Sequence, residues 1–302
     1  MKVVGFDTSN YTTSIAIFDG VSGENCSRLL PVKPGELGLR QSDAVFSHTK
    51  SLPELSGRLF SHAENISAVG VSTRPRAVEG SYMPCFMVGY SHAKLISDLL
   101  GVPLIQISHQ QGHVAAALWS AGRMDLMDKP HLAWHLSGGT TELLLVEPEG
   151  KNVKCTKLGG TSDISAGQLI DRTGVMLDLP FPAGKHVDAL SKDAVNTDLF
   201  KVKCTSLEFS LSGVQNKVQQ YAAQNPPAET AAYALRCVCH GVKTATENAK
   251  KLYPGLEVVF SGGVASNSML RNVMSDAIFA EPAFSTDNAM GVAILAHRMM
   301  EG

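Results

Sequence analysis

Short apolar runs alternate along the chain with turns rich in glycine and hydroxyl residues. Residues 3–18 contain two apolar runs that flank a polar turn at residues 7–11, a pattern that predicts a pair of adjacent strands. Residues 131–146 repeat this pattern around a second turn at residues 137–141. Two copies of one hairpin pattern predict a duplicated domain.

Strands and helices are predicted to alternate through the rest of the chain. Compact apolar runs indicate buried strands, and apolar positions repeating every three to four residues indicate helices. This alternation is typical of the α/β fold class. The predicted strands are 68–71, 103–107 and 256–260, and the predicted helices are 87–100, 165–177, 212–223, 229–252 and 289–300.

The length of 302 residues is enough for two lobes that each bury a core. We expect an N-terminal lobe at residues 1–115, with residues 285–302 packing back on it. Residues 116–284 would form the C-terminal lobe.

Composition narrows the class of protein. Hydrophobic residues make up 44% and charged residues 18%, which is ordinary for a globular protein. No apolar run approaches the 18 residues of a membrane span, and Asp7 follows the start too closely for a signal peptide, so we expect a cytoplasmic protein without membrane contact. The six cysteines contain no Cys-x-x-Cys pair, which argues against a disulfide framework or a cysteine zinc site.

The net charge of −2 excludes the overall basicity of a dedicated nucleic-acid binder. Any RNA contact is therefore local or supplied by a partner. Arg74 and Arg76 are candidates for a local phosphate contact, although a solvated surface loop is the more common explanation of such a pair.

Three glycine or hydroxyl turns follow predicted strands and are candidates for nucleotide binding. They are the first turn at 7–11, the second hairpin turn Ser137-Gly138-Gly139-Thr140, and Ser261-Gly262-Gly263, which precedes a helix that we expect to start at Asn267. Residues without bulky side chains let backbone N–H groups approach phosphate oxygens. A single turn of this kind is usually only a tight turn, whereas three after strands favour a nucleotide site.

His109 and His113 are candidates for metal binding. Their spacing places both imidazoles on one face of a predicted helix, within reach of one ion. Asp287, just before the last predicted helix, would provide a third ligand of a type that completes such sites. The alternatives are two histidines without a ligand role and an Asp287 that only caps the helix.

Taken in order, these motifs resemble the TsaD family and its archaeal and eukaryotic counterparts, once described as O-sialoglycoprotein endopeptidases. The resemblance covers nearly the whole chain. The matching segments are Gly5-Phe6-Asp7-Thr8-Ser9, His109-x-x-x-His113, Ser137-Gly138-Gly139, Ala166-Gly167-x-x-x-Asp171, Phe209-Ser210-Leu211-Ser212-Gly213, Gly262-Gly263-Val264-Ala265-Ser266-Asn267 and Ser285-Thr286-Asp287-Asn288.

The resemblance implies a two-lobed actin/hexokinase-type (ASKHA) fold with duplicated domains. It implies transfer of a threonylcarbamoyl group from threonylcarbamoyl-adenylate to N6 of adenosine in tRNA, with release of AMP. It also implies one divalent metal, iron or zinc, in the cleft between the lobes, with ATP or an adenylate as the bound nucleotide. Expected partners are tRNA, a smaller paralogue subunit and an ATPase subunit. The implied metal ligands are His109, His113 and Asp287, and the implied nucleotide or substrate contacts are Ser137, Gly138, Gly139, Thr140, Asp171, Gly184 and Asn267.

The chain departs from the family pattern at four places. Asn10-Tyr11-Thr12 replaces Cys-Asp-Glu in the first turn, so two acidic residues are missing. Gln111 replaces a glutamate between the histidines, and Thr140 replaces the histidine of Ser-Gly-Gly-His. Arg74-Pro75-Arg76 replaces Gly-Pro-Gly. The catalytic residues therefore remain unassigned from the sequence.

Several functions stay open at this stage. A metal- and nucleotide-binding paralogue without transferase activity, acting as a regulatory or scaffolding subunit, fits the missing acids. A metalloprotease fits poorly, because the sequence lacks the glutamate of His-Glu-x-x-His that activates water. A sugar or acetate kinase of the same fold class would transfer the γ-phosphate of ATP and not release AMP.

Overall fold

The computed structural model describes residues 1–31, 39–62 and 64–301. Contacts between residues divide the chain into two compact units, each with its own sheet. Unit 1 comprises Met1–Pro130, Glu147–Cys155 and Asp287–Gly302, and unit 2 comprises His131–Val146 and Thr156–Thr286.

These units differ in detail from the expected lobes. Helix α3 (His109–Ser120) crosses the expected boundary after residue 115, and unit 1 continues to Pro130. Unit 1 also includes the tip of a hairpin, Glu147–Cys155. The lobe boundaries drawn from the sequence stay a prediction.

Unit 1 is built on a five-stranded sheet with the strand order β3-β2-β1-β4-β5. β1 pairs antiparallel with β2, starting from Val3 opposite Phe18, and pairs parallel with β4 on its other side. β4 is in turn parallel to β5. The strands are β1 (Lys2–Thr8), β2 (Thr12–Phe18), β3 (Gly23–Leu29), β4 (Ile66–Arg74) and β5 (Leu104–Ser108).

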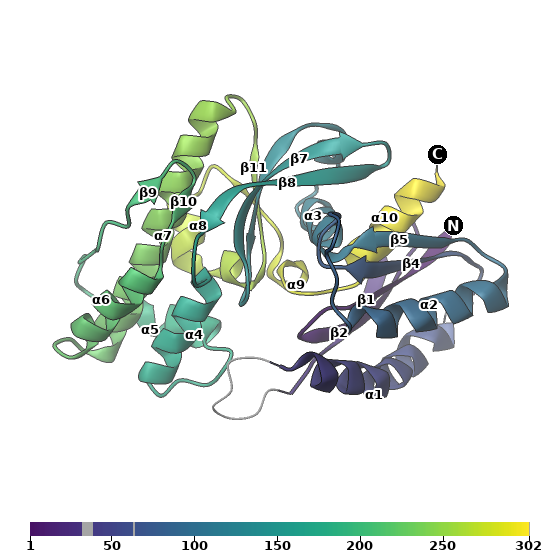
Figure 1. Ribbon diagram of the computed structural model, residues 1–302, viewed down its shortest axis with the longest axis horizontal. Coiled ribbons are helices and arrows are strands. Elements are labelled where there is room, and N and C mark those ends of the chain that lie inside the picture. The colour runs from purple at the N-terminus through teal and green to yellow at the C-terminus, as the bar shows by residue number, and fades with distance from the viewer. Residues whose placement is uncertain (32–38, 63, 302) are drawn as a thin grey trace. The chain divides into compact units, whose positions relative to one another are not determined.

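Helices cover both faces of this sheet (Figure 1). Leu52 and Leu55 of α1 and Val88 of α2 join one core with Phe6 and Val71 of the sheet. On the other face, glycines of β1 and β4 make room for α10. The helices are α1 (Gln41–Leu59), α2 (Phe86–Leu100), α3 (His109–Ser120) and α10 (Met290–Met300), with short 3-10 turns η1 (Phe60–His62) and η2 (Met124–Asp128).

Close packing at Gly5 fixes the start of α10. A methyl group at Gly5 would lie 2.7 Å from both the Ala289 carbonyl oxygen and the Ala293 backbone nitrogen. Real side chains do not approach that closely, so glycine is required for α10 to lie directly on β1. Asp287 comes just before this helix and is therefore held near the end of β1.

Unit 2 repeats the strand order of unit 1. Its sheet runs β12-β11-β6-β7-β8-β10-β9, in which β6 and β7 form an antiparallel hairpin and β6, β11 and β12 are parallel. The order β8-β7-β6-β11-β12 corresponds strand for strand to β3-β2-β1-β4-β5, so the duplication predicted from the hairpins is confirmed. The strands are β6 (His131–Leu136), β7 (Thr141–Glu149), β8 (Asn152–Thr161), β9 (Cys204–Thr205), β10 (Glu208–Phe209), β11 (Val258–Ser261) and β12 (Ile278–Phe279).

The core of unit 2 forms where its longest helix packs on the sheet. Trp134, Phe209 and Phe260 are almost fully buried, and the Trp134 indole N–H donates to Thr246 Oγ1 of α7 at 2.8 Å. The indole is therefore buried without an unsatisfied donor. The helices are α4 (Ala166–Met176), α5 (Gly184–Leu190), α6 (Ser212–Ala222), α7 (Pro227–Leu252), α8 (Ser268–Val273) and α9 (Pro282–Ser285), with 3-10 turns η3 (Ser191–Asp193) and η4 (Gly263–Ser266).

Most predicted elements are confirmed within one or two residues. Gly101 ends α2 in the left-handed conformation with φ 65°, and Asn267 caps α8 by accepting from the Leu270 N–H at 3.0 Å, as expected. Helix α1 and strand β3 were not among the elements predicted from the sequence. Among the described residues, we find no helix whose length and apolarity would let it cross a membrane.

Candidate functional site

Helix α3 begins directly after β5 and presents His109 and His113. Ser108 caps the helix: its hydroxyl accepts from the Gln111 N–H at 3.3 Å, and Gln111 Oε1 accepts from the Ser108 N–H at 2.9 Å. This capping box fixes the first turn of α3. The two histidines lie one helical turn apart and point the same way.

Gln111 has a structural role that the sequence comparison did not anticipate. Besides its part in the cap, its amide Nε2 donates to the Val153 carbonyl oxygen at 2.7 Å, and the residue is buried. A glutamate lacks this N–H donor. The glutamine that differs from the family pattern thus belongs to the cap of α3, and its side chain does not point toward His109 and His113.

A glycine contact between α3 and α10 brings the third side chain close. A methyl group at Gly291 would overlap the carbonyl group of Gly112, which neighbours His113. The two helices therefore cross with their backbones in contact. This crossing places Asp287, four residues before Gly291, beside the histidines.

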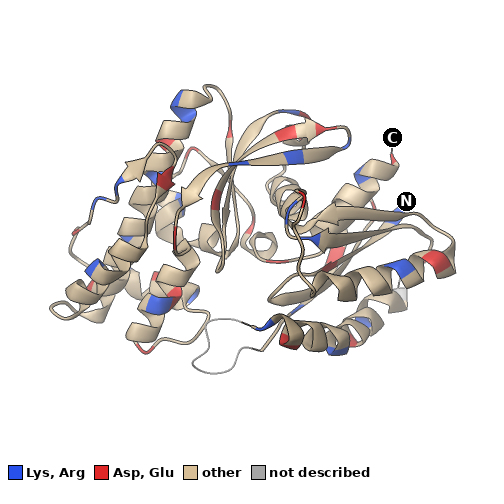
Figure 2. Cartoon of the chain, viewed as in Figure 1, with Lys and Arg blue, Asp and Glu red and all other residues tan. Residues whose placement is uncertain are grey.

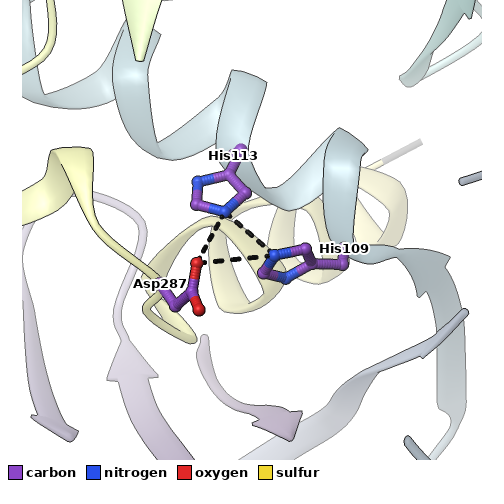
Figure 3. A group of neighbouring side chains, drawn as sticks. All are labelled: His109, His113 and Asp287. Atoms are coloured by element: carbon purple, nitrogen blue, oxygen red, sulfur yellow. Dashed lines mark hydrogen bonds and ion pairs between the residues drawn. The ribbon is translucent and has the colours of Figure 1, made fainter. Parts of the chain in front are cut away.

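His109, His113 and Asp287 converge on one point (Figure 3). The two Nε2 atoms lie 3.0 Å apart, and Asp287 Oδ1 lies 3.2 Å from His113 Nε2 and 3.6 Å from His109 Nε2. Ligand atoms bound to one zinc or iron ion at about 2.1 Å lie roughly 3.0–3.4 Å apart. The three separations are close to this range, so the side chains fit a single divalent ion.

The helix-cap alternative for Asp287 does not match the structure. The N-cap of α10 is Ala289, without a side-chain cap, and both Asp287 carboxylate oxygens point elsewhere. Oδ1 faces the histidines, and Oδ2 accepts from the Ser9 hydroxyl at 3.0 Å. His109, His113 and Asp287 form the one group of three or more possible ligand side chains within the described ranges.

The electrostatics of this group favour a cation. Burial alone lowers the pKa of His109, but the charges of Asp7 and Asp287 outweigh it and raise this pKa to about 10. Burial and the adjacent His109 charge lower the pKa of His113. Burial raises the pKa of Asp287, yet hydrogen bonds from the two histidines outweigh that effect and hold it well below its usual range. Two carboxylate side chains therefore lie beside the two imidazoles in a partly buried site, a set of groups that suits a divalent cation.

The predicted nucleotide turn of unit 2 is formed as a closed hydrogen-bonded loop. The Ser137 N–H donates to the Thr140 carbonyl oxygen at 2.8 Å, and the Thr140 N–H donates to Ser137 Oγ at 3.1 Å. The Ser165 hydroxyl, which also caps α4, donates to the Gly138 carbonyl oxygen at 2.6 Å. The turn therefore lies against the N-terminus of α4, where helix dipoles favour anions.

The other predicted nucleotide residues lie on elements of unit 2 that hydrogen bonds connect to one another. Asp171 of α4 accepts from the Ala183 N–H at 2.8 Å, next to Gly184. Burial raises the pKa of Asp171, against the lowering effect of this bond. Asn267 Nδ2 donates to Asp188 of α5 at 2.7 Å. The structure thus gathers all seven predicted residues in unit 2, while their binding role stays a prediction.

Three glycines of this group are not explained by the fold. A methyl group on Gly138, Gly139 or Gly184 would meet no atom within 4 Å, and none of the three has a positive φ. By contrast, a methyl group at Gly167 would lie 2.5 Å from the Gly138 Cα. Packing therefore requires Gly167, whereas an approaching ligand would account for the other three.

Sequence reasoning missed Asp7, Ser9 and Asp188. Asp7 and Ser9 belong to the first turn, a nucleotide-binding candidate, and no contact with the histidines or Asp287 was predicted for them; polar residues at the end of an apolar strand were a usable signal. Asp188 lies one helical turn after Gly184 and accepts from both Asn267 and Ser268. Its spacing from Gly184 was the only signal in the sequence.

Known proteins resemble this chain in sequence and in fold. Curated tRNA N6-adenosine threonylcarbamoyltransferases include that of Carboxydothermus hydrogenoformans, 32% identical over 254 residues, covering 79% of this chain and 73% of the relative. That of Kosmotoga olearia is 32% identical and covers 98% of this chain and 93% of the relative.

Solved structures show the fold alone, because their sequence identity is low. Full-length HypF in its phosphate- and nucleotide-bound form has a TM-score of 0.64 at 13% identity, over 100% of this chain and 47% of that one. A ROK family glucokinase from Streptomyces griseus, in complex with glucose and AMPPNP, has a TM-score of 0.56 at 10% identity, over 99% and 100%. The predicted actin/hexokinase-type fold is confirmed.

A family model also matches most of the chain. The model described as TsaD, tRNA N6-adenosine threonylcarbamoyltransferase, matches residues 42–294. This range includes every predicted metal ligand and nucleotide residue. The chain therefore belongs to the TsaD family of tRNA N6-adenosine threonylcarbamoyltransferases.

Proposed function

We propose that this protein transfers a threonylcarbamoyl group from threonylcarbamoyl-adenylate to N6 of an adenosine in tRNA, with the help of one divalent metal ion, iron or zinc. The observation that supports this most is the convergence of His109, His113 and Asp287 in a member of this family. The same family membership supports a cytoplasmic site of action, where tRNA is present.

The metal ligands would be His109 Nε2, His113 Nε2 and Asp287 Oδ1. A bound metal would supply a Lewis acid that polarises the carbamoyl carbonyl group of the donor. Three protein ligands leave a position for a substrate oxygen, as in catalytic metal sites. The burial of His113, only 5% exposed, helps to keep bulk water from competing for that position.

Unit 2 would bind the adenylate. Backbone N–H groups of the Ser137–Thr140 turn would donate to the phosphate, because Gly138 and Gly139 present no side chain there. Asp171 and Asn267 offer an acceptor and a donor for the ribose and base, and Asn267 has a second amide N–H beyond the one on Asp188. Gly184 would allow close approach of the nucleotide to α5.

In the proposed reaction, the exocyclic amine of the tRNA adenine attacks the carbamoyl carbonyl carbon. An N–C bond forms, the bond from that carbon to the phosphate oxygen breaks, and AMP leaves with the electron pair. The amine loses one proton. Binding both reactants in the right orientation supplies much of the rate enhancement.

RNA binding would rest on local contacts and partners. Figure 2 shows Lys and Arg interspersed with Asp and Glu on the visible elements, in keeping with the net charge of −2. Arg74 and Arg76 flank Pro75, whose carbonyl oxygen accepts from the Gln110 N–H at 3.0 Å, so their loop adjoins the start of α3. We propose this loop as a phosphate contact, and a smaller paralogue and an ATPase as partner subunits.

A transfer assay tests the proposal. The protein is incubated with threonylcarbamoyl-adenylate and unmodified tRNA, with and without the paralogue and ATPase partners, and modified adenosine is quantified by mass spectrometry. We expect product that disappears with a chelator and with His113→Ala. His92→Ala is the matched control, because His92 lies on α2 with its Nδ1 2.8 Å from the Val88 carbonyl oxygen, outside the ligand group.

Each alternative gives a different result in this assay. A protein that binds metal and adenylate but gives no product, even with partners, would be a regulatory paralogue. Formation of ADP from ATP with a sugar or acetate acceptor would identify a kinase. Product that is insensitive to chelator and to His113→Ala would contradict metal assistance.

A further inference from the structure

Two buried side chains at the end of β1 contact the candidate metal ligands from behind. Asp7 is 1% exposed and Ser9 is 3% exposed. A buried carboxylate is strongly destabilising unless charged or hydrogen-bonded partners surround it. The partners of Asp7 and Ser9 are therefore informative about what these residues do.

Each of the two residues holds one candidate ligand. Asp7 Oδ2 lies 2.7 Å from His109 Nδ1, the ring nitrogen on the opposite side from the ligand group. The Ser9 hydroxyl donates to Asp287 Oδ2 at 3.0 Å, which leaves Oδ1 facing the histidines. In both cases, the atom that is not a candidate ligand is occupied.

The two contacts are linked to each other. The Ser9 backbone N–H donates to Asp7 Oδ1 at 2.9 Å, so the Asp7 carboxylate accepts from Ser9 with one oxygen and faces His109 with the other. An asparagine offers one acceptor oxygen in place of these two. With a proton on His109 Nδ1, only a carboxylate accepts from both donors in this arrangement.

The segment that carries Asp7 and Ser9 is itself fixed in place. Thr8, between them, donates its hydroxyl to the Cys85 carbonyl oxygen at 2.9 Å and accepts from the Gly89 N–H at 3.1 Å. It is completely buried. The segment is thus anchored to the start of α2, which lets it impose an orientation on the ligands that it contacts.

We propose that Asp7 and Ser9 are positioning residues for the divalent metal, acting through His109 and Asp287. The inference rests on the proposed metal ligands. Asp7 keeps the Nδ1–H of His109 occupied, so that the lone pair of Nε2 points at the metal. It also adds negative charge behind the ring, which makes the imidazole a stronger ligand. Ser9 selects which oxygen of Asp287 is presented.

Metal titration of the purified full chain tests this proposal. The protein is stripped with chelator and titrated with Zn²⁺ by calorimetry, and with Co²⁺ by visible absorption, which reports ligand geometry. Loss of an outer partner typically weakens metal binding about 10–100-fold. We expect that loss for Asp7→Asn with a changed Co²⁺ spectrum, and a smaller loss of roughly 3–10-fold for Ser9→Ala.

Two further variants define the scale. His109→Ala removes a proposed ligand and should weaken binding more than either outer variant. Asp98→Asn removes an exposed carboxylate that pairs with Lys94 on α2, and should leave Zn²⁺ affinity and the Co²⁺ spectrum unchanged. If Asp7→Asn does not fold, as judged by circular dichroism, Ser9→Ala decides the question, because it deletes one hydroxyl group.

The possible outcomes separate this inference from the proposed function. Zn²⁺ affinity within twofold of the unchanged protein for the folded outer variants would overturn the positioning role. A parent protein that binds no Zn²⁺ or Co²⁺ would overturn it as well, together with the ligand assignment. Tight metal binding that depends on Asp7, without any transfer to tRNA, would support the inference and contradict the proposed function.

Discussion

The candidate metal ligands of unit 1 and the candidate nucleotide turn of unit 2 use different parts of the chain. In unit 1, side chains point at one another, with separations of 3.0–3.6 Å between the ligand atoms. In unit 2, the turn offers mainly backbone groups, and Asn267 and Ser165 already support other parts of the chain. A candidate site built from side chains is thus recognised by the contacts between them. A candidate site built from backbone groups is recognised by glycines that neither packing nor a positive φ requires.

The duplicated sheets make this comparison informative. The first hairpin of each sheet contributes to its candidate site: Asp7, at the end of β1, and Ser9, in the β1–β2 turn, contact metal-ligand candidates, and Ser137–Thr140 form the β6–β7 turn. One copy of the hairpin contacts the candidate metal ligands, and the other forms a glycine turn. If both candidate sites bind as proposed, one topological position serves two kinds of chemistry.

The largest effect is expected where the metal ligands depend on close helix packing. Gly291→Ala would force a methyl group into the backbone of Gly112, which cannot move aside. We expect a loss of roughly 3 kcal/mol in the free energy of unfolding and loss of Zn²⁺ binding, measured by urea denaturation and calorimetry. Gly57→Ala, in α1 with no atom within 4 Å, is the control and should stabilise by about 0.5–1 kcal/mol. Unchanged stability of Gly291→Ala would show that the crossing is looser than described.

An effect of intermediate size is expected for glycine substitutions in unit 2, where one variant should weaken nucleotide binding and another should weaken the fold. Gly139→Ala adds a methyl group in open space, so we expect unchanged thermal stability but roughly tenfold weaker AMP binding by calorimetry. Gly167→Ala should instead destabilise the fold, because its methyl group would overlap the adjacent turn. If Gly139→Ala binds AMP as well as the parent chain, the turn does not contact the nucleotide.

The smallest effect on stability is expected at Asp163, close to the residue that contacts the Ser137–Thr140 turn. Asp163, two residues before Ser165, accepts from Leu211 and Ser212 N–H groups at 2.9 and 3.2 Å. Burial raises its pKa, but hydrogen bonds from Ser210 and Ser212 outweigh burial and lower the pKa to about 2. Because the pKa of Asp163 is lower in the folded state than its unfolded value near 3.9, its ionised carboxylate stabilises the folded protein above about pH 4. This contribution to the free energy of unfolding is lost as the pH falls through 2.

Replacing Asp163 tests that linkage. Asp163→Asn should cost about 1 kcal/mol at pH 7, because the carboxylate is exposed and partly screened by solvent. The difference from the parent chain should shrink between pH 4 and pH 2, as followed by urea denaturation at each pH. A difference that stays constant over this range would assign the effect to shape and not to charge.

Features that depend on residues close together in the chain could be predicted from the sequence. Both hairpins, the capped α8 and the pairing of His109 with His113 follow from spacing within a few residues. Helix α1 was not predicted, because Pro53 lies inside it and prolines normally end helices. Strand β3 was missed because none of its residues is buried and its apolar pattern is weak.

Long-range contacts lay beyond sequence reasoning. Asp7 meets His109 across 102 residues, and Ser9 meets Asp287 across 278. No periodicity encodes such contacts. Gln111 shows a role that the motif comparison did not predict, since its side chain caps α3 and donates to the Val153 carbonyl oxygen.

The position of α10 has a consequence for how the protein is made. Asp287 and α10 belong to unit 1 but follow all of unit 2 in the chain, and Asp287 lies 174 residues after His113. During synthesis, both histidines leave the ribosome long before Asp287 has been added to the chain. Unit 2 can therefore fold while the sheet of unit 1 still lacks the helix that covers one of its faces. If the proposed metal binds, loading by all three ligands would consequently come late, after the end of the chain has been synthesised.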